Sequence, residues 1–180
     1  MVPCHSLTLE EQLETLKKVT IFSGFNDDDL RFICESCTIM EAPVGEMILE
    51  EGSEASEILI MLKGRVTIVL NITEDPIEIM DFGPGSCIGE ASVIGIQPHS
   101  ASAVVIEDAI CMVLHRQVLM DLFVQNKALF SLLILNIARE LARRLHHTDE
   151  ILLHYGKMKK SHELLHPGLI KEITVSRHSS

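Results

Sequence analysis

Between residues 38 and 114 the chain is a series of short strand-like segments separated by glycine, proline or polar residues. This pattern is typical of antiparallel strands that close into a barrel or sandwich. The predicted strands cover residues 38–42, 47–50, 57–62, 65–71, 77–81, 102–106 and 109–114. Lys63 and Gly64 stand between two of them and predict a tight turn, because glycine adopts a positive φ without steric cost. The expected fold is therefore mainly β.

Helical spacing replaces this pattern on both sides of the β region. Leucines at amphipathic spacing predict a helix over residues 7–18, with Ser6 as its N-cap. The acidic residues after Asn26 predict a second, short helix through about Ser36. Residues 117–153 return to helical spacing, with an apolar stripe of Phe130, Ile134, Ile137, Leu141, Leu145 and Leu152 and with Arg139, Arg143 and Arg144 interspersed. So broad a stripe predicts packing on the β region and on a second copy, in a homodimer.

The expected organisation has three parts. Residues 1–18 form an N-terminal helix, residues 19–153 the main domain, and residues 154–180 a polar, flexible tail. Within the main domain, the barrel covers about 37–115 and the C-terminal helices about 117–153. The tail is too short for a helix-turn-helix module of the kind that reads DNA.

Charge and composition narrow the partners. The 180 residues carry a net charge of −11, whereas coating nucleic acid requires a basic surface. The acidic excess lies in residues 1–100, with 18 acidic against 5 basic residues. The longest apolar run is about half the length that a membrane span requires, and the start lacks a secretory signal pattern. We expect a cytoplasmic protein that binds neither nucleic acid nor membrane, with its five cysteines as free thiols.

The sequence contains no constellation typical of a nucleophilic or acid–base active site, no phosphate loop and no dinucleotide fingerprint. We therefore expect no enzyme activity, no metal and no cofactor. Cys34 and Cys37 have the spacing of half a zinc site or of a redox pair, but no second pair stands at a suitable distance. The favoured interpretation is that they are two small apolar residues where a helix meets a strand.

A segment studded with glycine connects the strands at residues 81 and 102, and it is too long for a hairpin turn. Gly89 allows the backbone to approach a ligand closely. Glu90 to Val93 are predicted to form one helical turn whose free amides point toward an anion such as a phosphate. The alternative is a capped turn that closes one end of the barrel.

Three separated motifs resemble one family. They are Gly45 to Gly52 (GEMILEEG), Ile58 to Val66 (ILIMLKGRV), and Gly89-Glu90-Ala91 followed by Pro98-x-Ser-Ala. Residues 19–150 resemble the cyclic-nucleotide-binding domain, the sensing part of catabolite-activator-like regulators and of protein kinase A regulatory subunits. The resemblance implies a jelly-roll-like barrel, a double-stranded β-helix, followed by a long helix. It also implies cyclic AMP or cyclic GMP as the ligand.

By the same resemblance, the segment from Gly89 to Ser100 is the family's phosphate-binding cassette. Glu90 then accepts a hydrogen bond from the ribose 2′-hydroxyl, the amides of Glu90 and Ala91 face the cyclic phosphate, and Ser100 donates from the other side. The family has an arginine where this chain has His99. An imidazole cannot grip two phosphate oxygens as a guanidinium does.

The substitution at His99 leaves three alternatives. A protonated His99 still holds the phosphate and binds more strongly at low pH, the pocket takes a different ligand, or it takes none. A fourth reading makes His99 an ordinary surface histidine of a loop. The first hypothesis is thus a sensor with a degenerate cassette that signals through its long helix. The second is a non-binding dimer that acts as a scaffold for an unidentified protein partner.

Overall fold

The computed structural model describes residues 7–159, with side chains through residue 153. In chain order its elements are α1 (Leu9–Leu16), η1 (Thr20–Phe22), α2 (Asp27–Ser36), β1 (Thr38–Ala42), β2 (Met47–Leu49), β3 (Glu57–Leu70), β4 (Ile77–Phe82), β5 (Cys87–Ile88), α3 (Glu90–Gly95), β6 (Ser102–His115), α4 (Arg116–Gln125) and α5 (Lys127–Lys159). The chain divides into two compact units, residues 1–141 and residues 142–180. The predicted boundaries at residues 18 and 153 stay predictions, and most of the predicted tail lies outside the described residues.

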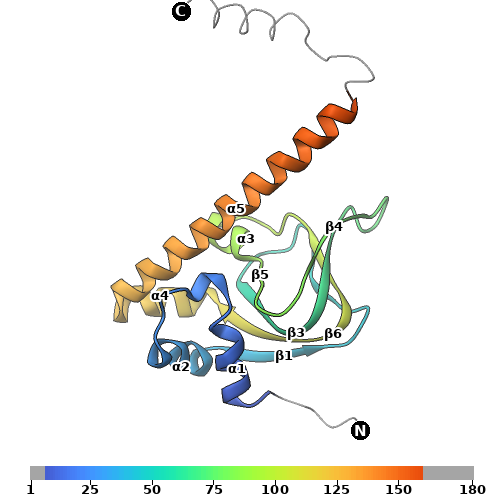
Figure 1. Ribbon diagram of the computed structural model, residues 1–180. Helices are drawn as coiled ribbons and strands as arrows, with labels where there is room; N and C mark the ends of the chain where they lie inside the picture. Colours follow the sequence, from blue (N-terminus) through green and yellow to red (C-terminus); the bar gives the residue numbers. More distant parts are fainter. Residues whose placement is uncertain (1–6, 160–180) are drawn as a thin grey trace, which may run out of the picture. The chain divides into compact units, whose positions relative to one another are not determined.

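The strands form one antiparallel sheet of six strands. Its order is β1-β6-β3-β4, with β2 also paired to β6 and β5 to β3. Figure 1 shows this sheet curling around a shared interior, with α1, α2 and α4 gathered at one side. The prediction of a mainly β fold with flanking helices and a long C-terminal helix is confirmed.

Two pairs of predicted strands are each a single strand. β3 continues through Lys63 and Gly64, so the tight turn predicted there is wrong. Gly64 has a φ of +78° and lies where the pairing of β3 with β6 shifts register. A β-bulge takes up an extra residue and bends a strand without ending it, so the glycine marks a bulge. β6 is likewise continuous from Ser102 to His115.

Side chains at the helix starts fix where the helices begin. α1 is capped by Thr8 rather than by Ser6, because Glu11 stands three residues later and closes a reciprocal capping box. Asn26 and Asp29 form the same arrangement at α2. Asn126 separates α4 from α5, and its Oδ1 accepts a hydrogen bond of 3.0 Å from the amide of Leu129. The helical region predicted at 117–153 therefore consists of two helices.

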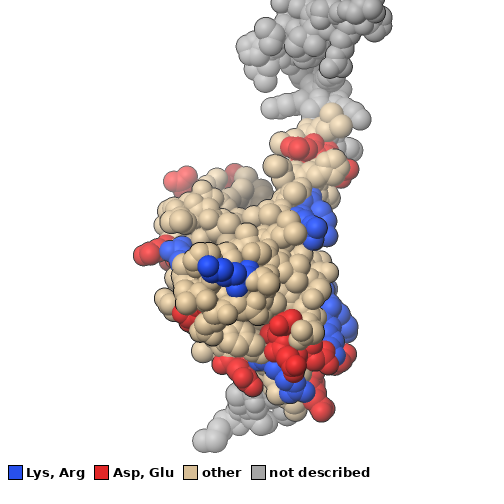
Figure 2. Space-filling model, turned by 90° about the vertical axis from the view of Figure 1, so that its left-hand side faces the viewer, with Lys and Arg blue, Asp and Glu red and all other residues tan. Residues whose placement is uncertain are grey.

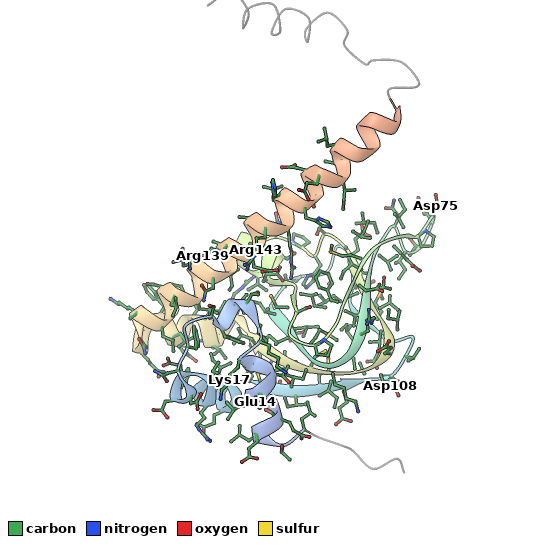
Figure 3. The ribbon with its side chains drawn as sticks, viewed as in Figure 1. Glu14, Lys17, Asp75, Asp108, Arg139 and Arg143 are labelled. Atoms are coloured by element: carbon green, nitrogen blue, oxygen red, sulfur yellow. The ribbon has the colours of Figure 1, made fainter. Side chains whose placement is uncertain are left out.

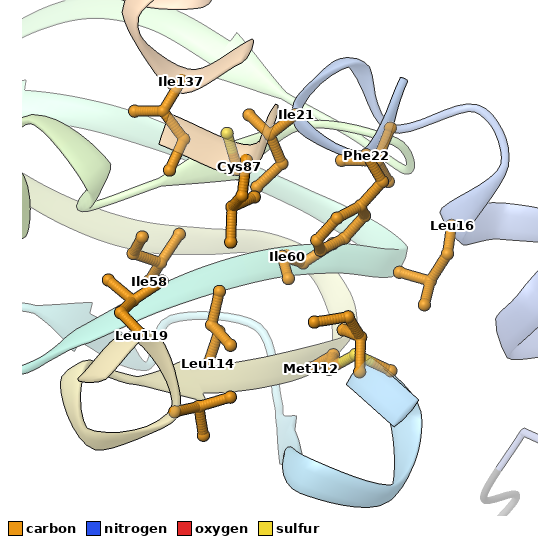
Figure 4. Close-up of a cluster of buried hydrophobic side chains, with 14 of the residues drawn as sticks. Leu16, Ile21, Phe22, Ile58, Ile60, Cys87, Met112, Leu114, Leu119 and Ile137 are labelled. Carbon is orange, nitrogen blue, oxygen red and sulfur yellow. The ribbon is translucent and has the colours of Figure 1, made fainter. Parts of the chain in front are cut away.

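The core has two layers, because side chains of β3 alternate between the two faces of the sheet. Figure 4 shows the layer that packs against the helices, in which Ile58 and Ile60 meet Ile21, Phe22 and other buried side chains. The second layer contains Leu59 and Met61 on the opposite face of β3. Cys111 lies there too, with its Sγ 3.4 Å from the Sδ of Met61.

The first part of α5 is anchored to the N-terminal segment. Asn136 is only 2% exposed, and its Nδ2 donates to the carbonyl oxygens of Ile21 (3.1 Å) and Ser23 (2.7 Å). One turn later, Glu140 accepts a hydrogen bond of 3.0 Å from the Thr20 hydroxyl. The two Asn136 bonds satisfy carbonyl groups of the turn around η1, and all three bonds join segments that lie more than a hundred residues apart.

The predicted apolar stripe of α5 does not behave as one surface. Ile137 is buried in the core, whereas Leu145 and Leu152 are 65% and 62% exposed. Leu129 and Leu133, which the prediction omitted, complete the buried face of the first part. The predicted homodimer would cover these exposed leucines with a second copy of the chain.

Charged groups are spread over the surface. Lys17 lies 3.5 Å from Glu14 on α1 and 3.2 Å from Asp27 at the start of α2. Figure 3 labels Lys17 and Glu14, which lie close together. The face in Figure 2 carries basic and acidic groups interspersed, without a continuous basic stripe. None of the helices in residues 7–159 combines the length and apolarity that crossing a bilayer requires.

Candidate functional site

Gly89 is the first residue of the predicted cassette and lies between β5 and α3. Its φ is +86°, in the left-handed region that side chains disfavour. A Cβ placed there would lie 2.9 Å from the carbonyl oxygen of Glu57 and 3.4 Å from Cε1 of His99. A glycine is therefore required at position 89 for two reasons: the backbone conformation, and the close approach of β3 and of His99.

Glu90 begins α3, so the predicted helical turn after Gly89 is present. The Glu90 side chain is 1% exposed, which means that its carboxylate is turned into the protein. Carboxylates are rarely buried unless their charge is compensated. Ala91, the next residue, is exposed on the first turn of α3. The prediction that the amides of these two residues face a phosphate stays a prediction.

His99 is buried at 6% exposure, so the surface alternative for this residue is wrong. Its backbone is held from both sides by the loop between β2 and β3. The His99 amide donates to the carbonyl oxygen of Ser53 (2.9 Å), and the amide of Gly52 donates to the carbonyl oxygen of His99 (2.8 Å). These two bonds fix the loop that carries the imidazole, with the ring beside Gly89.

Burial also affects the charge of His99. It lowers the pKa of the His99 imidazole below its ordinary value of 6.5, and the nearby carboxylate of Glu57 opposes this shift. Because the lowering by burial is the larger effect, His99 is mostly neutral at pH 7 in the free protein. The alternative in which a protonated His99 holds the phosphate therefore starts from a mostly neutral imidazole at pH 7.

The structure brings together some of the predicted residues and separates others. The His99 ring lies beside Gly89, with Cε1 at 3.4 Å from where a Cβ on Gly89 would be, and Glu90 follows Gly89 directly, whereas Ser100 is exposed. The segment between Glu90 and His99 contains Ile96, which follows the last residue of α3. Its φ of +51° is unusual for a β-branched residue. Strained backbone of this kind often accompanies binding sites.

Two residues near the cassette were missed by sequence reasoning. The carbonyl oxygen of Glu57 lies 2.9 Å from where a Cβ on Gly89 would be, and the Glu57 carboxylate raises the pKa of His99 against the effect of burial. Arg116 lines a hollow of about 260 Å³ with Gln97 and Pro98 of the cassette loop, and its Nη2 donates to the carbonyl oxygen of Ala55 (2.6 Å). Neither residue belongs to a local pattern, since long-range strand pairing brings both to the site.

Cys34 and Cys37, the two cysteines with the spacing of a metal or redox pair, are partly buried against the core. Burial raises the pKa of the Cys37 thiol to about 12, with a smaller contribution from Cys34, and both residues pack against the core. The thiolate is the form that binds metals and reacts, so these thiols are in an inert state. Among the residues that the structure describes, no group of three or more potential metal ligands comes together.

Comparison with known proteins relates this geometry to a family. Residues 39–126 match the cyclic nucleotide-binding domain. A crystal structure of a cyclic nucleotide-binding domain from Methylobacillus flagellatus is 28% identical, with a TM-score of 0.73, and covers 81% of this chain and 83% of that one. The catabolite activator protein of Thermus thermophilus is 25% identical, with a TM-score of 0.67, and covers 76% of this chain and 63% of that one.

A curated relative is much longer than this chain. The cAMP-dependent protein kinase regulatory subunit of Yarrowia lipolytica is 25% identical over 129 residues, which are 67% of this chain and 33% of that protein. The similarity therefore spans about a third of the relative and concerns its domain rather than the whole regulatory subunit. Sequence match and fold agree on the same region, and through residues 39–126 the chain belongs to the cyclic nucleotide-binding domain family.

Proposed function

We propose that this chain is a regulatory module that binds a cyclic nucleotide, cyclic AMP or cyclic GMP, in the cassette around Gly89, Glu90 and His99. It binds the ligand without transforming it and passes the signal through α5 to a protein partner. The observation that carries this proposal is the burial of both Glu90, which follows Gly89 in the chain, and His99, whose ring comes close to Gly89 because glycine has no side chain.

Each cassette residue has a role that fits its chemistry. The buried carboxylate of Glu90 accepts a hydrogen bond from the ribose 2′-hydroxyl. The amides at the start of α3 and the exposed hydroxyl of Ser100 donate to the cyclic phosphate. His99 contributes charge only when it is protonated, because a neutral imidazole offers a single N–H. The resulting site is weaker at neutral pH than one with a guanidinium.

Signalling requires a ligand that prefers one position of the long helix over another, since equal preference shifts no equilibrium. The bonds of Asn136 and Glu140 hold the first part of α5 against the N-terminal turn. We place the ligand-sensitive movement in the part of α5 beyond this anchor.

Binding of the nucleotide is expected to strengthen as the pH falls. The phosphate stays anionic over this range and favours the protonated form of His99, so binding takes up a proton. Because burial lowers the pKa of His99 below 6.5 in the free protein, the gain continues below that pH. Calorimetric titration with cyclic AMP and cyclic GMP at about pH 8 and about pH 5.5 measures it, with a rise of up to about tenfold per pH unit.

The control for this experiment is His99→Gln, whose side chain is neutral at every pH. This variant is expected to bind weakly and with a flat pH profile. Equal affinity of the unaltered protein at both pH values would contradict the role of His99. An absence of heat with millimolar nucleotide at either pH would favour the second candidate function.

The second candidate is a homodimer that acts as a protein-interaction scaffold. The observation in its favour is a row of exposed positions on α5 at alternating steps of three and four residues. The row consists of Leu135, Ala138, Ala142, Leu145, Asp149 and Leu152. This heptad spacing is that of a two-stranded coiled coil. A dimer along α5 also fits the first function, because a movement of α5 would then act on the α5 helix of the second copy.

Replacing Leu145 by glutamate is expected to separate the dimer. Leu145 occupies a seam position, and a carboxylate there loses the apolar contact and is buried without a partner. The dissociation constant should rise about a hundredfold or more. Leu153→Glu is the matched control, because Leu153 is also exposed, at 59%, but lies off the seam. Sedimentation equilibrium decides: equal masses for the two variants would rule out this seam.

A further inference from the structure

Arg116, the first residue of α4, holds one end of the loop between β2 and β3. Its Nη2 donates to the carbonyl oxygen of Ala55 (2.6 Å), and its backbone amide donates to the carbonyl oxygen of Ser56 (2.8 Å). Ala55 is only 1% exposed, so water has little access to replace this donor. The side chain and the backbone of one residue thus fix this end of the loop.

The other end of the same loop holds His99. The His99 amide donates to the carbonyl oxygen of Ser53 (2.9 Å), and the amide of Gly52 donates to the carbonyl oxygen of His99 (2.8 Å). The Ser53 amide also donates to the carbonyl oxygen of Glu50 (3.1 Å), which closes a turn at this point. Residues 52–56, here called the bridging loop, are therefore fastened to the cassette at one end and to the start of α4 at the other.

A hollow of about 260 Å³ lies beside the bridging loop. Arg116 lines this hollow together with Ile96, Gln97 and Pro98 of the cassette segment. Atoms that border a space lack the packing contacts on that side that would hold them in place. The hydrogen bonds through the bridging loop therefore do more to fix His99 relative to α4 than packing across the hollow does.

The guanidinium of Arg116 occupies this place at an energetic cost. Within the part of the chain that the structure describes, its Nε is buried and has no hydrogen-bond partner. An unsatisfied buried donor is unfavourable, because it has given up water without gaining an acceptor. The bond to Ala55 is the contact that offsets this cost.

We propose that Arg116 is a positioning residue of the cassette: through the bridging loop it ties His99 to the start of α4 and keeps the imidazole in one place beside Gly89. A cyclic nucleotide then meets a histidine that is already in position, which lowers the cost of binding. The proposal deepens the function proposed above. The positioning itself concerns the free protein, and only its use for a nucleotide rests on that function.

The test compares amide hydrogen exchange, measured by NMR in the free protein, between the unaltered chain and Arg116→Met. Methionine keeps an unbranched side chain but has no donor for the carbonyl group of Ala55. The amides of Gly52 and His99 are expected to exchange at least about tenfold faster, because a hydrogen bond from a charged donor supports a change of that size.

An internal reference and two further variants make the result specific. The amide of Gly85 donates to the carbonyl oxygen of Met61 (2.9 Å) and should keep its rate in Arg116→Met, whereas a general loss of stability would speed it equally. Arg65→Met removes an exposed arginine whose Nε lies 3.5 Å from Oε1 of Glu107, and it should leave the bridging loop unchanged. Arg116→Lys keeps a charged donor and should restore part of the protection.

Unchanged exchange of the Gly52 and His99 amides in Arg116→Met would overturn the proposal. So would an equal acceleration at Gly85, or an equal effect of Arg65→Met. If the methionine variant does not fold, Arg116→Gln, which is shorter and uncharged, takes its place in the same comparison.

The outcome is separable from that of nucleotide binding. If Arg116→Met speeds exchange in the bridging loop while neither cyclic AMP nor cyclic GMP binds the unaltered chain, the proposed function fails and the positioning role stands. If the nucleotide binds and Arg116→Met leaves both exchange and affinity unchanged, the function stands and this role fails. With both correct, Arg116→Met binds the nucleotide at least about fivefold more weakly, and Arg65→Met binds it like the unaltered chain.

Discussion

His99→Arg is expected to tighten cyclic-nucleotide binding by about tenfold to 150-fold at neutral pH. A hydrogen bond to a charged group contributes about 1.5–3 kcal/mol, which corresponds to this range of dissociation constants. The guanidinium is charged at every pH of interest and donates to two phosphate oxygens at once. The variant should therefore also lose the pH dependence that the imidazole imparts.

Two further variants are needed to interpret this result. Glu90→Ala should abolish binding, because it removes the acceptor for the ribose hydroxyl and leaves a void where a carboxylate was buried. His146→Arg adds the same charge at a histidine whose side chain is 80% exposed on α5, and it should leave the affinity unchanged. If His99→Arg and Glu90→Ala both bind like the unaltered protein, the nucleotide does not occupy this cassette. Thermal melts of each variant show that the comparison is made between folded proteins.

Gly64→Ala is expected to be the most destabilising change of a single residue discussed for this chain. A Cβ there overlaps the carbonyl oxygen of Asp108 and lies 2.6 Å from that of Glu107 and 2.7 Å from Cα of Ala109. All three obstacles are backbone atoms of β6, so none can move aside by changing a rotamer. The positive φ adds about 1–2 kcal/mol of strain for a residue with a side chain.

The free energy of unfolding should fall by at least about 3 kcal/mol, and Tm by about 6–12 °C. Gly45→Ala is the matched control, since Gly45 has a similar φ of +89° but no atom within 4 Å of the position of its Cβ. Only the conformational cost, about 1–2 kcal/mol, applies there. Denaturant unfolding of both variants separates steric overlap from conformational strain. If the free energy of unfolding falls no more in Gly64→Ala than in Gly45→Ala, the backbone of β6 must move away from the added methyl group at the bulge.

Features governed by neighbouring residues were predictable from the sequence. The capping side chain at Asn26, the strand patterns and the helical turn after Gly89 each depend on residues within a few positions of one another. The glycine at position 64 was also noticed, but a turn and a bulge use the same local signal. Only pairing with β6, more than forty residues later, distinguishes them.

The candidate site shows the same limit. Gly89, Glu90 and His99 were found by pattern, but the burial of His99 depends on Gly52 and Ser53, which belong to a different loop. The electrostatic neighbour Glu57 is brought in by the approach of β3 to Gly89. Burial decides whether an imidazole is charged, and burial is a property of the assembled fold. The charge of the cassette therefore lay beyond what the sequence predicted.

The hydrophobic layer beneath the sheet has a consequence for how this domain can be divided into fragments. Leu16, Ile21 and Ile33 enter that layer from before the family match, and Leu133 and Ile137 enter it from after. A fragment trimmed to residues 39–126 would keep α4 on this face of the sheet but lose the buried side chains that α1, η1, α2 and α5 contribute. The unit that folds is thus wider than the segment that matches the family, and a fragment meant to fold by itself needs both flanks.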